Sequence, residues 1–496
     1  MPRYILAIDQ GTTGTTVALV DHRGLLRDAV NYEFPQIYPQ PGWVEHRPED
    51  IWNSVLKGIR TLLRRKHCKA SDIAAIGITN QRETALLWDA RRDEALYNAI
   101  VWQCRRTTPL CEALKKQGAE PAVKRKTGLV LDPYFSATKW AWLLKNAPGV
   151  KAGLKAGTLR AGTIDSYLVW KLSNGQDHVT DVSNASRTLL MNIRRADWDS
   201  SLLELFDVPR ELLPRIVPSS GVMSYTRAVP GLPDGIPISG VAGDQQSALF
   251  GQACFTEGDA KCTFGTGSFI LMNTGKKPVT SKAGLLTTVG WQLAGDIGLT
   301  YALEGGAFVC GAAVQWLRDE LRIIKKAPDV EALAASVADH GGVEFVPALT
   351  GLGAPWWEPQ ARGTITGLTR GAGRGHIARA TLDAMALQNM DILVAMERDL
   401  GKRMKPLRVD GGAARNDLLM QIQADLLGRK LVRPKVIETT VAGASYLAGL
   451  GVGLWSRPAD IRKLWRADKE FQVQMRPAAR QRRINHWHGA IKQTLA

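Results

Sequence analysis

The chain has 496 residues, of which 45% are hydrophobic and 22% are charged. Values so close to those of soluble globular proteins exclude a largely disordered chain, and at roughly 150 residues per domain the length predicts two to four structural units. The net charge of +17 is compatible with a nucleic acid or a nucleotide phosphate as partner, and equally with a solvated basic surface.

Apolar runs at the start of the chain predict an antiparallel β-meander. The runs cover residues 4–8, 15–20 and 25–34, and tight turns separate them. An amphipathic helix is expected from Pro48, and a strand is expected at residues 73–79. The first 80 residues therefore predict the order β-β-β-α-β.

A second block begins near residue 236 and repeats part of this pattern. A buried strand at 236–243 leads to Asp244 and a helix at 245–252, after which two strands flank the turn Gly265-Thr266-Gly267. The echo of the first meander predicts two related halves, residues 1–252 and 253–496. The second half is completed by helices at 377–400, 416–427 and 440–454 and a strand at 407–409.

The end of the chain is rich in basic residues. Residues 461–492 contain nine Lys and Arg against two acidic residues, which predicts a basic helical tail from about residue 456. Trp465, Phe471 and Trp487 are expected to pack on the body of the protein, because no nucleic-acid-binding motif accompanies them. A nucleic-acid partner is therefore not expected.

The cysteines and the first residues bear on location. The six cysteines include no CxxC pair, which fits a reducing compartment. A strand-like run starts at Tyr4 with no preceding signal-peptide hydrophobic stretch, and the longest uncharged stretch, residues 439–456, has the four glycines of a buried helix. We expect a cytoplasmic protein without a membrane span.

Three glycine-centred turns carry the chemistry, since the sequence has neither a Walker A loop nor a Rossmann fingerprint. The first runs from Asp9 to Thr13, where backbone N–H groups and two hydroxyls can bind phosphate and the carboxylate can hold Mg²⁺. The second is Gly265-Thr266-Gly267. The third is Asp410-Gly411-Gly412, where the backbone can approach an adenine ring and Asn416 can bond its edge. Each turn alone is more often a structural hairpin.

The order of these turns resembles that of the actin, sugar kinase and Hsp70 ATPase superfamily. Further matching stretches resemble the FGGY carbohydrate kinases, in particular the branch that phosphorylates glycerol; they are residues 78–84, 98–107, 132–136, 243–246, 301–305 and 351–355. The resemblance implies an α/β fold of two ribonuclease-H-like domains, as in actin-like ATPases, with the active site in the cleft between them. It also implies transfer of phosphate from ATP to glycerol, with Mg²⁺, to give sn-glycerol 3-phosphate.

The residues that would bind glycerol combine donors with acceptors. Arg82 can only donate and Glu83 can only accept, so the pair could clamp neighbouring hydroxyls; a surface ion pair is the alternative. Asp244 can take the proton of the attacking hydroxyl as general base, and it can also cap the following helix. The resemblance implies that Arg82 and Glu83 bind glycerol. It implies the same for Tyr134, Asp244 and Gln245, while Trp102 and Phe269 pack against the C–H face of glycerol.

The nucleotide site is expected at the glycine-centred turns. The resemblance implies that Asp9 takes part in catalysis by holding Mg²⁺, through water. It further implies contacts with the phosphates from one set of residues, Thr12, Thr13, Gly14 and Thr266. A second set would flank the nucleotide: Gly311, Gln315, Gly412 and Asn416.

Two departures from the family pattern change the expectations. In many bacterial members of that branch the first turn continues with two serines and an arginine that reaches the phosphates, whereas this chain has Thr15 and Thr16 after Gly14. We expect altered ATP affinity or turnover from this change. The Gly-Thr-Arg that binds fructose bisphosphate in some members is here Pro233-Asp234-Gly235, so we expect a homodimer without that inhibition or the tetramer that accompanies it.

Two other functions compete with this one. The first is an FGGY kinase for another polyol or a ketose, which would need a wider pocket than Trp102, Tyr134 and Phe269 leave. The second is a non-catalytic, nucleotide-binding regulatory protein, which Thr16 favours slightly. Asp9, Asp244 and the Arg82–Glu83 pair argue against the second.

Overall fold

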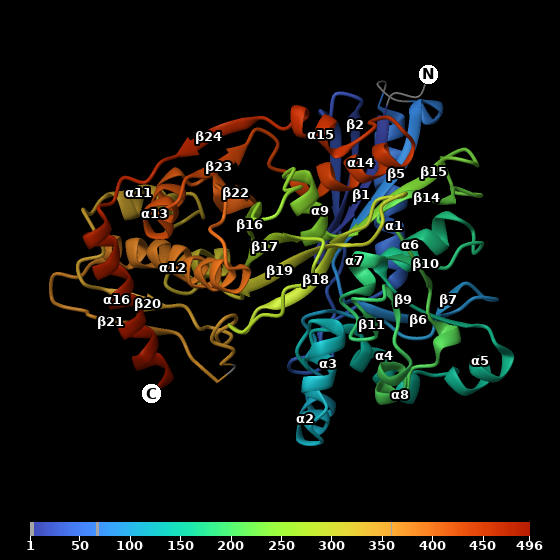
Figure 1. The fold of residues 1–496 in the computed structure, drawn as a ribbon, viewed down its shortest axis with the longest axis horizontal. Helices are drawn as coiled ribbons and strands as arrows, with labels where there is room; N and C mark the ends of the chain where they lie inside the picture. The colour runs from blue at the N-terminus through green and yellow to red at the C-terminus, as the bar shows by residue number, and fades with distance from the viewer. Residues whose placement is uncertain (1–3, 66–68, 359) are drawn as a thin grey trace.

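Two mixed β-sheets organise the protein, one in each of two lobes (Figure 1). The structure is a computed structural model that describes residues 4–65, 69–358 and 360–496, so Cys68 lies outside the described residues. The first sheet has the strand order β14-β15-β5-β1-β2-β3, and the second has the order β18-β19-β17-β16-β22-β23-β24. Helices cover both sheets, which confirms the predicted α/β class.

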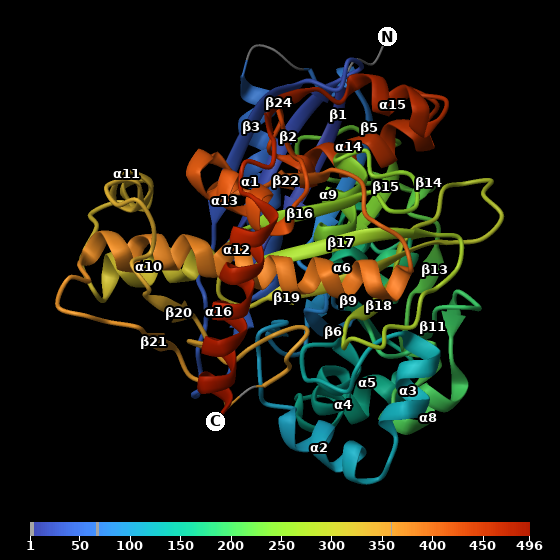
Figure 2. The same cartoon turned by 60° about the vertical axis from the view of Figure 1, so that its left-hand side comes forward.

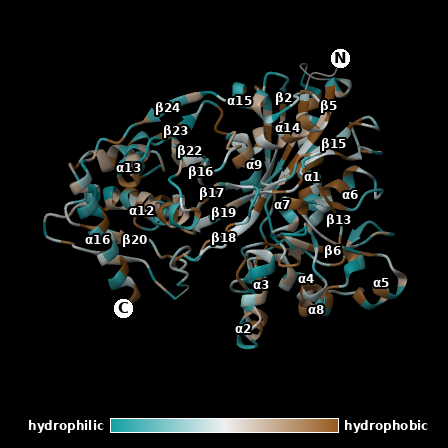
Figure 3. Ribbon diagram, in the orientation of Figure 1, coloured by the Kyte–Doolittle hydropathy of each residue, from teal (hydrophilic) through white to brown (hydrophobic). Residues whose placement is uncertain are grey.

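The first sheet contains the predicted β-meander. Its strands are β1 (Tyr4–Gln10), β2 (Gly14–Asp21), β3 (Leu26–Glu33), β5 (Ile73–Asn80), β14 (Ser220–Tyr225) and β15 (Pro237–Gly243). β1, β2 and β3 are antiparallel, while β5 runs parallel to both β1 and β15. Most hydrophobic residues of β1, β2, β5 and β15, which are brown in Figure 3, are buried, and helix α1 (Pro48–Arg64) places its apolar face against this sheet.

The second sheet repeats this arrangement. Its strands are β16 (Ala260–Phe264), β17 (Ser268–Gly275), β18 (Leu286–Trp291), β19 (Thr300–Ala307), β22 (Leu407–Asp410), β23 (Leu431–Pro434) and β24 (Ala467–Phe471). β19-β17-β16-β22-β23 has the same order and the same directions as β3-β2-β1-β5-β15 in the first sheet. The echo of Gly-Thr turns in the sequence therefore reflects a structural repeat.

Helix α14 (Thr439–Gly451) comes from the second half of the chain but packs on the first sheet and on helix α9 (Asp244–Gly251). The two helices cross very closely, because a Cβ atom on Gly443 would lie 1.8 Å from the Ser247 carbonyl oxygen. Hydroxyls of Ser220 and Ser239 donate to carbonyl oxygens of α14. The division of the chain at residues 252 and 253 stays a prediction, and α14 lies with the first lobe.

The remaining elements surround the two sheets. In the first lobe, β4 (Glu45–His46), β6 (Ala85–Asp89), β7 (Glu94–Ala95), β8 (Ala99–Ile100) and β9 (Leu159–Thr163) form a smaller sheet. The helices around it are α2 (Thr108–Lys116), α3 (Glu120–Thr127), α4 (Ser136–Asn146), α5 (Val150–Ala156), α6 (Ile164–Leu172), α7 (Val182–Ala185) and α8 (Ser200–Phe206). Short two-stranded pairs are β10 (Val179–Asp181) with β13 (Arg215–Val217) and β11 (Met191–Asn192) with β12 (Asp197–Trp198).

The long helix α12 (Arg374–Leu400) crosses the second lobe, and α16 (Pro477–Leu495) lies over it (Figure 2). The other elements of this half are α10 (Gly311–Asp319), α11 (Asp329–Ala335), α13 (Asp417–Leu427), α15 (Pro458–Leu464) and the strand pair β20 (Glu344–Val346) and β21 (Thr364–Thr366). Within the described ranges, no helix combines the length and the hydropathy that crossing a bilayer would require.

The prediction of a helical tail is wrong for residues 467–471. They form β24, which pairs antiparallel with β23 and adds an edge strand to the second sheet. The segment carries three charged residues and therefore contains no apolar run, yet Phe471 is buried where the strand meets the lobe. Trp487 is fully buried, as expected of a side chain packed on the body.

Candidate active site

The candidate site lies where three parallel strands of the first sheet end. Asp9 lies near the end of β1, Arg82 and Glu83 follow β5, and Asp244 follows β15. Because β1 and β15 both pair in parallel with β5, these ends meet at one edge of the sheet. The topology of the sheet thus brings four of the predicted residues together.

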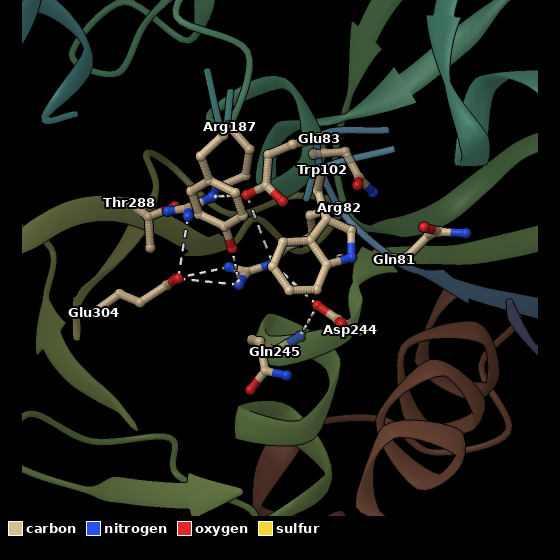
Figure 4. A network of polar contacts seen from close by, with 12 residues as sticks. Gln81, Arg82, Glu83, Trp102, Arg187, Asp244, Gln245, Thr288 and Glu304 are labelled. Carbon is tan, nitrogen blue, oxygen red and sulfur yellow. Dashed lines mark hydrogen bonds and ion pairs between the residues drawn. The ribbon is translucent and has the colours of Figure 1, made fainter. Parts of the chain in front are cut away.

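Arg82 is the centre of the polar network (Figure 4). Its Nε lies 3.0 Å from Asp244 Oδ1, while Nη1 and Nη2 donate to the two oxygens of Glu304 over 2.6 and 3.0 Å. Nη2 also lies 3.4 Å from the hydroxyl of Tyr134. Burial opposes the charge of Arg82, but Glu304 and the other nearby acids raise its pKa well above the usual value, so Arg82 is a fixed cation.

An unusual backbone turn brings Arg82 and Glu83 into the same site. Adjacent residues of a regular strand point to opposite faces, but Glu83 has φ 62 and the Thr84 N–H donates to the Arg82 carbonyl oxygen over 2.8 Å. This is a γ-turn of the rare, strained kind. Left-handed backbone at a buried, non-glycine residue costs energy and is found mainly at functional sites, which favours the clamp over the surface ion pair considered above.

Two buried residues that the sequence analysis did not single out hold this pair in place. Arg187 donates from Nε to Glu83 over 2.6 Å and from Nη2 to Glu304 over 3.1 Å. Burial would raise the pKa of Glu304, but Arg187 and Arg82 lower it to about 2, so Glu304 is ionised. Glu304 lies on β19 of the second sheet, whereas both arginines come from the first half of the chain.

Three aromatic residues form the wall beside this network. The ring of Trp102 lies edge-on to those of Tyr134 and Phe269, with centroid distances of 5.6 and 6.4 Å. The indole Nε1 of Trp102 donates to Thr12 Oγ1 over 2.9 Å. Since an indole N–H can only donate, the Thr12 hydroxyl accepts this bond and keeps its own proton for another acceptor. Trp102 thus joins the aromatic wall to the first glycine turn.

Both Gly-Thr turns join antiparallel strands as hairpins. The Gly11 N–H donates to the Gly14 carbonyl oxygen, and the Gly265 N–H donates to the Gly267 carbonyl oxygen, each over 2.9 Å. Helix α10 begins against the second hairpin, because the Gly311 N–H donates to the Gly265 carbonyl oxygen over 3.0 Å. A Cβ atom on Gly311 would lie only 2.6 Å from that oxygen, so the approach requires glycine.

The other predicted nucleotide residues are mostly exposed. Thr13 and Thr266 are exposed at the tips of their hairpins, Gln315 is exposed on α10, and Gly412 is exposed after β22. Asn416 Oδ1 accepts the N–H of Leu419 over 2.8 Å and so caps α13. The NH₂ group of Asn416 is the part of the side chain that could contact adenine, and this contact stays a prediction.

Asp9 is the residue best suited to a cation. Its pKa is raised to about 8 by burial and by the negative charges of Asp244 and Glu438. Within the described ranges, no group of three or more His, Cys, Asp or Glu side chains is arranged to hold a metal ion by itself. The residues therefore fit Mg²⁺ held mainly by water and phosphate oxygens, with the Asp9 carboxylate beside it.

The pH dependence of the Tm of Asp9→Asn should show that burial and the neighbouring negative charges disfavour the ionised Asp9 carboxylate. The pKa of Asp9 in the folded state, about 8, lies above its usual value of 3.8, so the wild-type protein loses stability as pH rises from about 4 to 8. Without metal or nucleotide, the Asp9→Asn variant should lack this loss and show a higher Tm than wild type at pH 8 but not at pH 5. A Tm difference that is the same at both pH values would contradict the raised pKa of Asp9.

The departure in the first hairpin is visible in the structure. Thr16 lies on β2, where its Oγ1 accepts a hydrogen bond from Asn31 Nδ2 over 3.0 Å. A short hydroxyl side chain bonded to the neighbouring strand brings no positive charge to the hairpin. Any cationic side chain that contacts phosphate at this hairpin must come from another part of the chain.

Comparison with known proteins gives the family. The N-terminal and C-terminal domains of the FGGY family of carbohydrate kinases match residues 4–251 and 260–452. Proteins named glycerol kinase from Bdellovibrio bacteriovorus and Symbiobacterium thermophilum are 58% and 54% identical to this chain, each covering 99% of it, with 99% and 98% of their own lengths aligned.

Solved structures agree with this result. The crystal structure of Plasmodium falciparum glycerol kinase with ADP has a TM-score of 0.93 and 36% identity over 99% of this chain and 98% of that one. A ligand-bound xylulose kinase from Lactobacillus acidophilus, 24% identical with a TM-score of 0.89 over 99% of this chain and 98% of its own, shares the fold. The chain belongs to the FGGY family of carbohydrate kinases.

Proposed function

We propose that the chain transfers the γ-phosphoryl group of MgATP to glycerol, giving sn-glycerol 3-phosphate and ADP. The observation that carries the proposal is the clamp of Arg82 and Glu83 beside Asp244, with Arg82 Nε 3.0 Å from the Asp244 carboxylate. The names of full-length relatives at 51–58% identity and of the ADP-bound structure support the same substrates.

The geometry suggests how the clamp would select glycerol. A small polyol can accept a hydrogen bond from Arg82 with one hydroxyl and donate one to Glu83 with the next, so it is favoured over a compound that lacks one of these hydroxyls. Arg82 would donate to one hydroxyl and Glu83 would accept from its neighbour. Trp102, Tyr134 and Phe269 would pack against the carbon skeleton and limit its size.

Asp244 would act as the general base. Its carboxylate is about one third exposed, unlike the buried groups behind it, so a substrate hydroxyl can reach it. Arg82 fixes one oxygen, Oδ1, which also accepts the Gln245 N–H over 2.7 Å. The second oxygen, Oδ2, is then directed to take the proton of the attacking hydroxyl as its bond to phosphorus forms. The helix-cap interpretation of Asp244 is wrong, because α9 begins at Asp244 itself and Gly243 is its N-cap residue.

The two hairpins would bind the phosphates through backbone N–H groups and the hydroxyls of Thr12, Thr13 and Thr266. Mg²⁺, when bound, would neutralise charge on the phosphates, with Asp9 beside it. Closure of the two lobes would exclude water, which competes with glycerol for the phosphoryl group. A cytoplasmic homodimer remains part of the proposal.

A coupled ADP-release assay with MgATP tests the proposal. Glycerol, erythritol, dihydroxyacetone, xylulose and ribulose are compared at equal concentration, and kcat/KM for glycerol is expected to be the highest by at least roughly a hundredfold, the range that an unpaired buried polar group can produce. Preference for a pentulose would contradict the substrate but keep the family. Binding of ATP with no turnover on any of these compounds would favour the regulatory alternative.

A further inference from the structure

Lys261 is a buried lysine that the proposed reaction does not yet use. It lies on β16, the strand that leads into the second hairpin, and its side chain is fully buried. Its Nζ donates to Gln245 Oε1, to Thr263 Oγ1 over 2.8 Å and to the Phe269 carbonyl oxygen over 3.4 Å. All three acceptors are neutral.

The ammonium group has no ion pair. Among the described residues, no carboxylate lies within 4 Å of Lys261 Nζ, although Asp410 and Asp244 act on it from a greater distance, opposed by Arg82. An ammonium buried without a carboxylate partner is costly. A lysine kept there at the expense of stability indicates a role at the site beside it.

The bond to Gln245 has a directional consequence. A lysine ammonium only donates, so it can bond the oxygen of the Gln245 amide but not its nitrogen. The amide is therefore fixed with Oε1 toward Lys261 and Nε2 away from it. Within the described residues Nε2 has no hydrogen-bond acceptor, and the atom is not fully buried. Because Gln245 directly follows Asp244, this NH₂ group is a donor available beside the base.

We propose that Lys261 is a positioning residue that locks the Gln245 amide with its NH₂ group toward the substrate. The proposal rests on the function proposed above. It assigns Gln245 a defined role, which is to donate to a substrate hydroxyl oxygen while Glu83 accepts from another hydroxyl. Without Lys261 the amide could flip and present its oxygen, which would repel the same hydroxyl oxygen.

A double-mutant cycle tests the proposal. Lys261→Met removes the donor while nearly keeping side-chain volume, and Gln245→Ala removes the amide. Each single change should raise KM for glycerol by up to roughly tenfold, the value of one hydrogen bond, with little change in KM for MgATP. The double variant should be no worse than Gln245→Ala, because Lys261 acts through Gln245. A double variant whose increase in KM for glycerol equals the product of the two single increases would overturn the proposal.

Stability separates positioning from a structural role. Because Lys261→Met removes a buried ammonium without an ion pair, its Tm should equal or exceed that of wild type. Lys126→Met is the matched control. Lys126 Nζ lies 2.8 Å from Asp199 Oδ1, in a part of the protein outside the site. The loss of this pair should lower Tm slightly and leave KM for glycerol unchanged. A Lys261→Met variant with lower Tm and normal KM would show that Lys261 is merely structural.

A second variant keeps the test informative if Lys261→Met does not fold. Gln245→Glu replaces the NH₂ group with an oxygen and gives Lys261 an ion-pair partner, so it should fold well and lose as much glycerol affinity as Gln245→Ala. Normal KM in Gln245→Glu would refute the assigned donor. If wild type prefers another polyol, the proposed function fails, and the same cycle measured with that polyol still decides the role of Lys261.

Discussion

Asp244→Asn should lower kcat for glycerol by roughly 10²- to 10⁴-fold, the contribution typical of a general base. Asn keeps an oxygen that can accept the bond from Arg82 Nε, now 3.0 Å from Asp244 Oδ1, so the pocket should keep its shape. KM for glycerol and for MgATP should therefore change by less than about threefold. Loss of rate without loss of binding is the mark of a group that acts mainly in the transition state.

The measurement is the coupled ADP-release assay, with binding of both substrates followed separately by calorimetry. Asp259→Asn is the control, because Asp259 is a buried aspartate at a turn whose carboxylate, within the described residues, pairs with Thr256, Lys405 and Arg462 and not with the site residues. Its kcat should stay near that of wild type. A kcat within tenfold of wild type in Asp244→Asn would exclude Asp244 as the base.

Glu304→Gln should have the second largest effect. Glu304 accepts from Arg82 through both oxygens and from Arg187 through one, so the change leaves two buried arginines with one carboxylate fewer. Breaking a buried pair in this way costs about 3–5 kcal/mol. We expect kcat/KM for glycerol to fall by roughly a hundredfold or more, because about 1.4 kcal/mol corresponds to a factor of ten, and the free energy of unfolding to fall as well.

Glu344→Gln separates the two effects. Glu344 is likewise buried and accepts from Arg483 Nη1 through both oxygens, over 2.6 and 2.8 Å, but it joins β20 to α16 far from the aromatic wall. Urea unfolding should show a comparable loss of stability in both variants, whereas only Glu304→Gln should lose kcat/KM. An equal loss of activity in both would reduce the role of Glu304 to general stability.

The sequence predicts the parts of the site that lie at ends of apolar runs. Asp9 and Asp244 each end a strand of the first sheet, and the Gly-Thr hairpins follow from tight turns between short strands. Both signals are local, because strand ends and turns depend on a few consecutive residues. The repeat of two sheets could be predicted for the same reason.

The residues that hold the clamp could not be predicted in this way. Arg187, Glu304 and Lys261 meet residues from 16 to 222 positions away in the sequence, and one sequence carries no record of such contacts. A signal was nevertheless present, since each is a lone charged residue within an apolar or small-residue run, and such residues are rarely buried without a partner. The packing of α14 on α9 likewise depends on a distant contact, at Gly443 and Ser247.

The split origin of the clamp limits how this site can be transplanted. Arg82 and Arg187 belong to one half of the chain, and Glu304, the carboxylate that both of them share, belongs to the other. Grafting the substrate-facing loops onto another sugar kinase scaffold would therefore carry over two buried arginines with one carboxylate fewer, unless the glutamate of β19 came with them. Redesign of substrate range is better directed at the aromatic wall, where Trp102 and Phe269 contribute shape without a charge to balance.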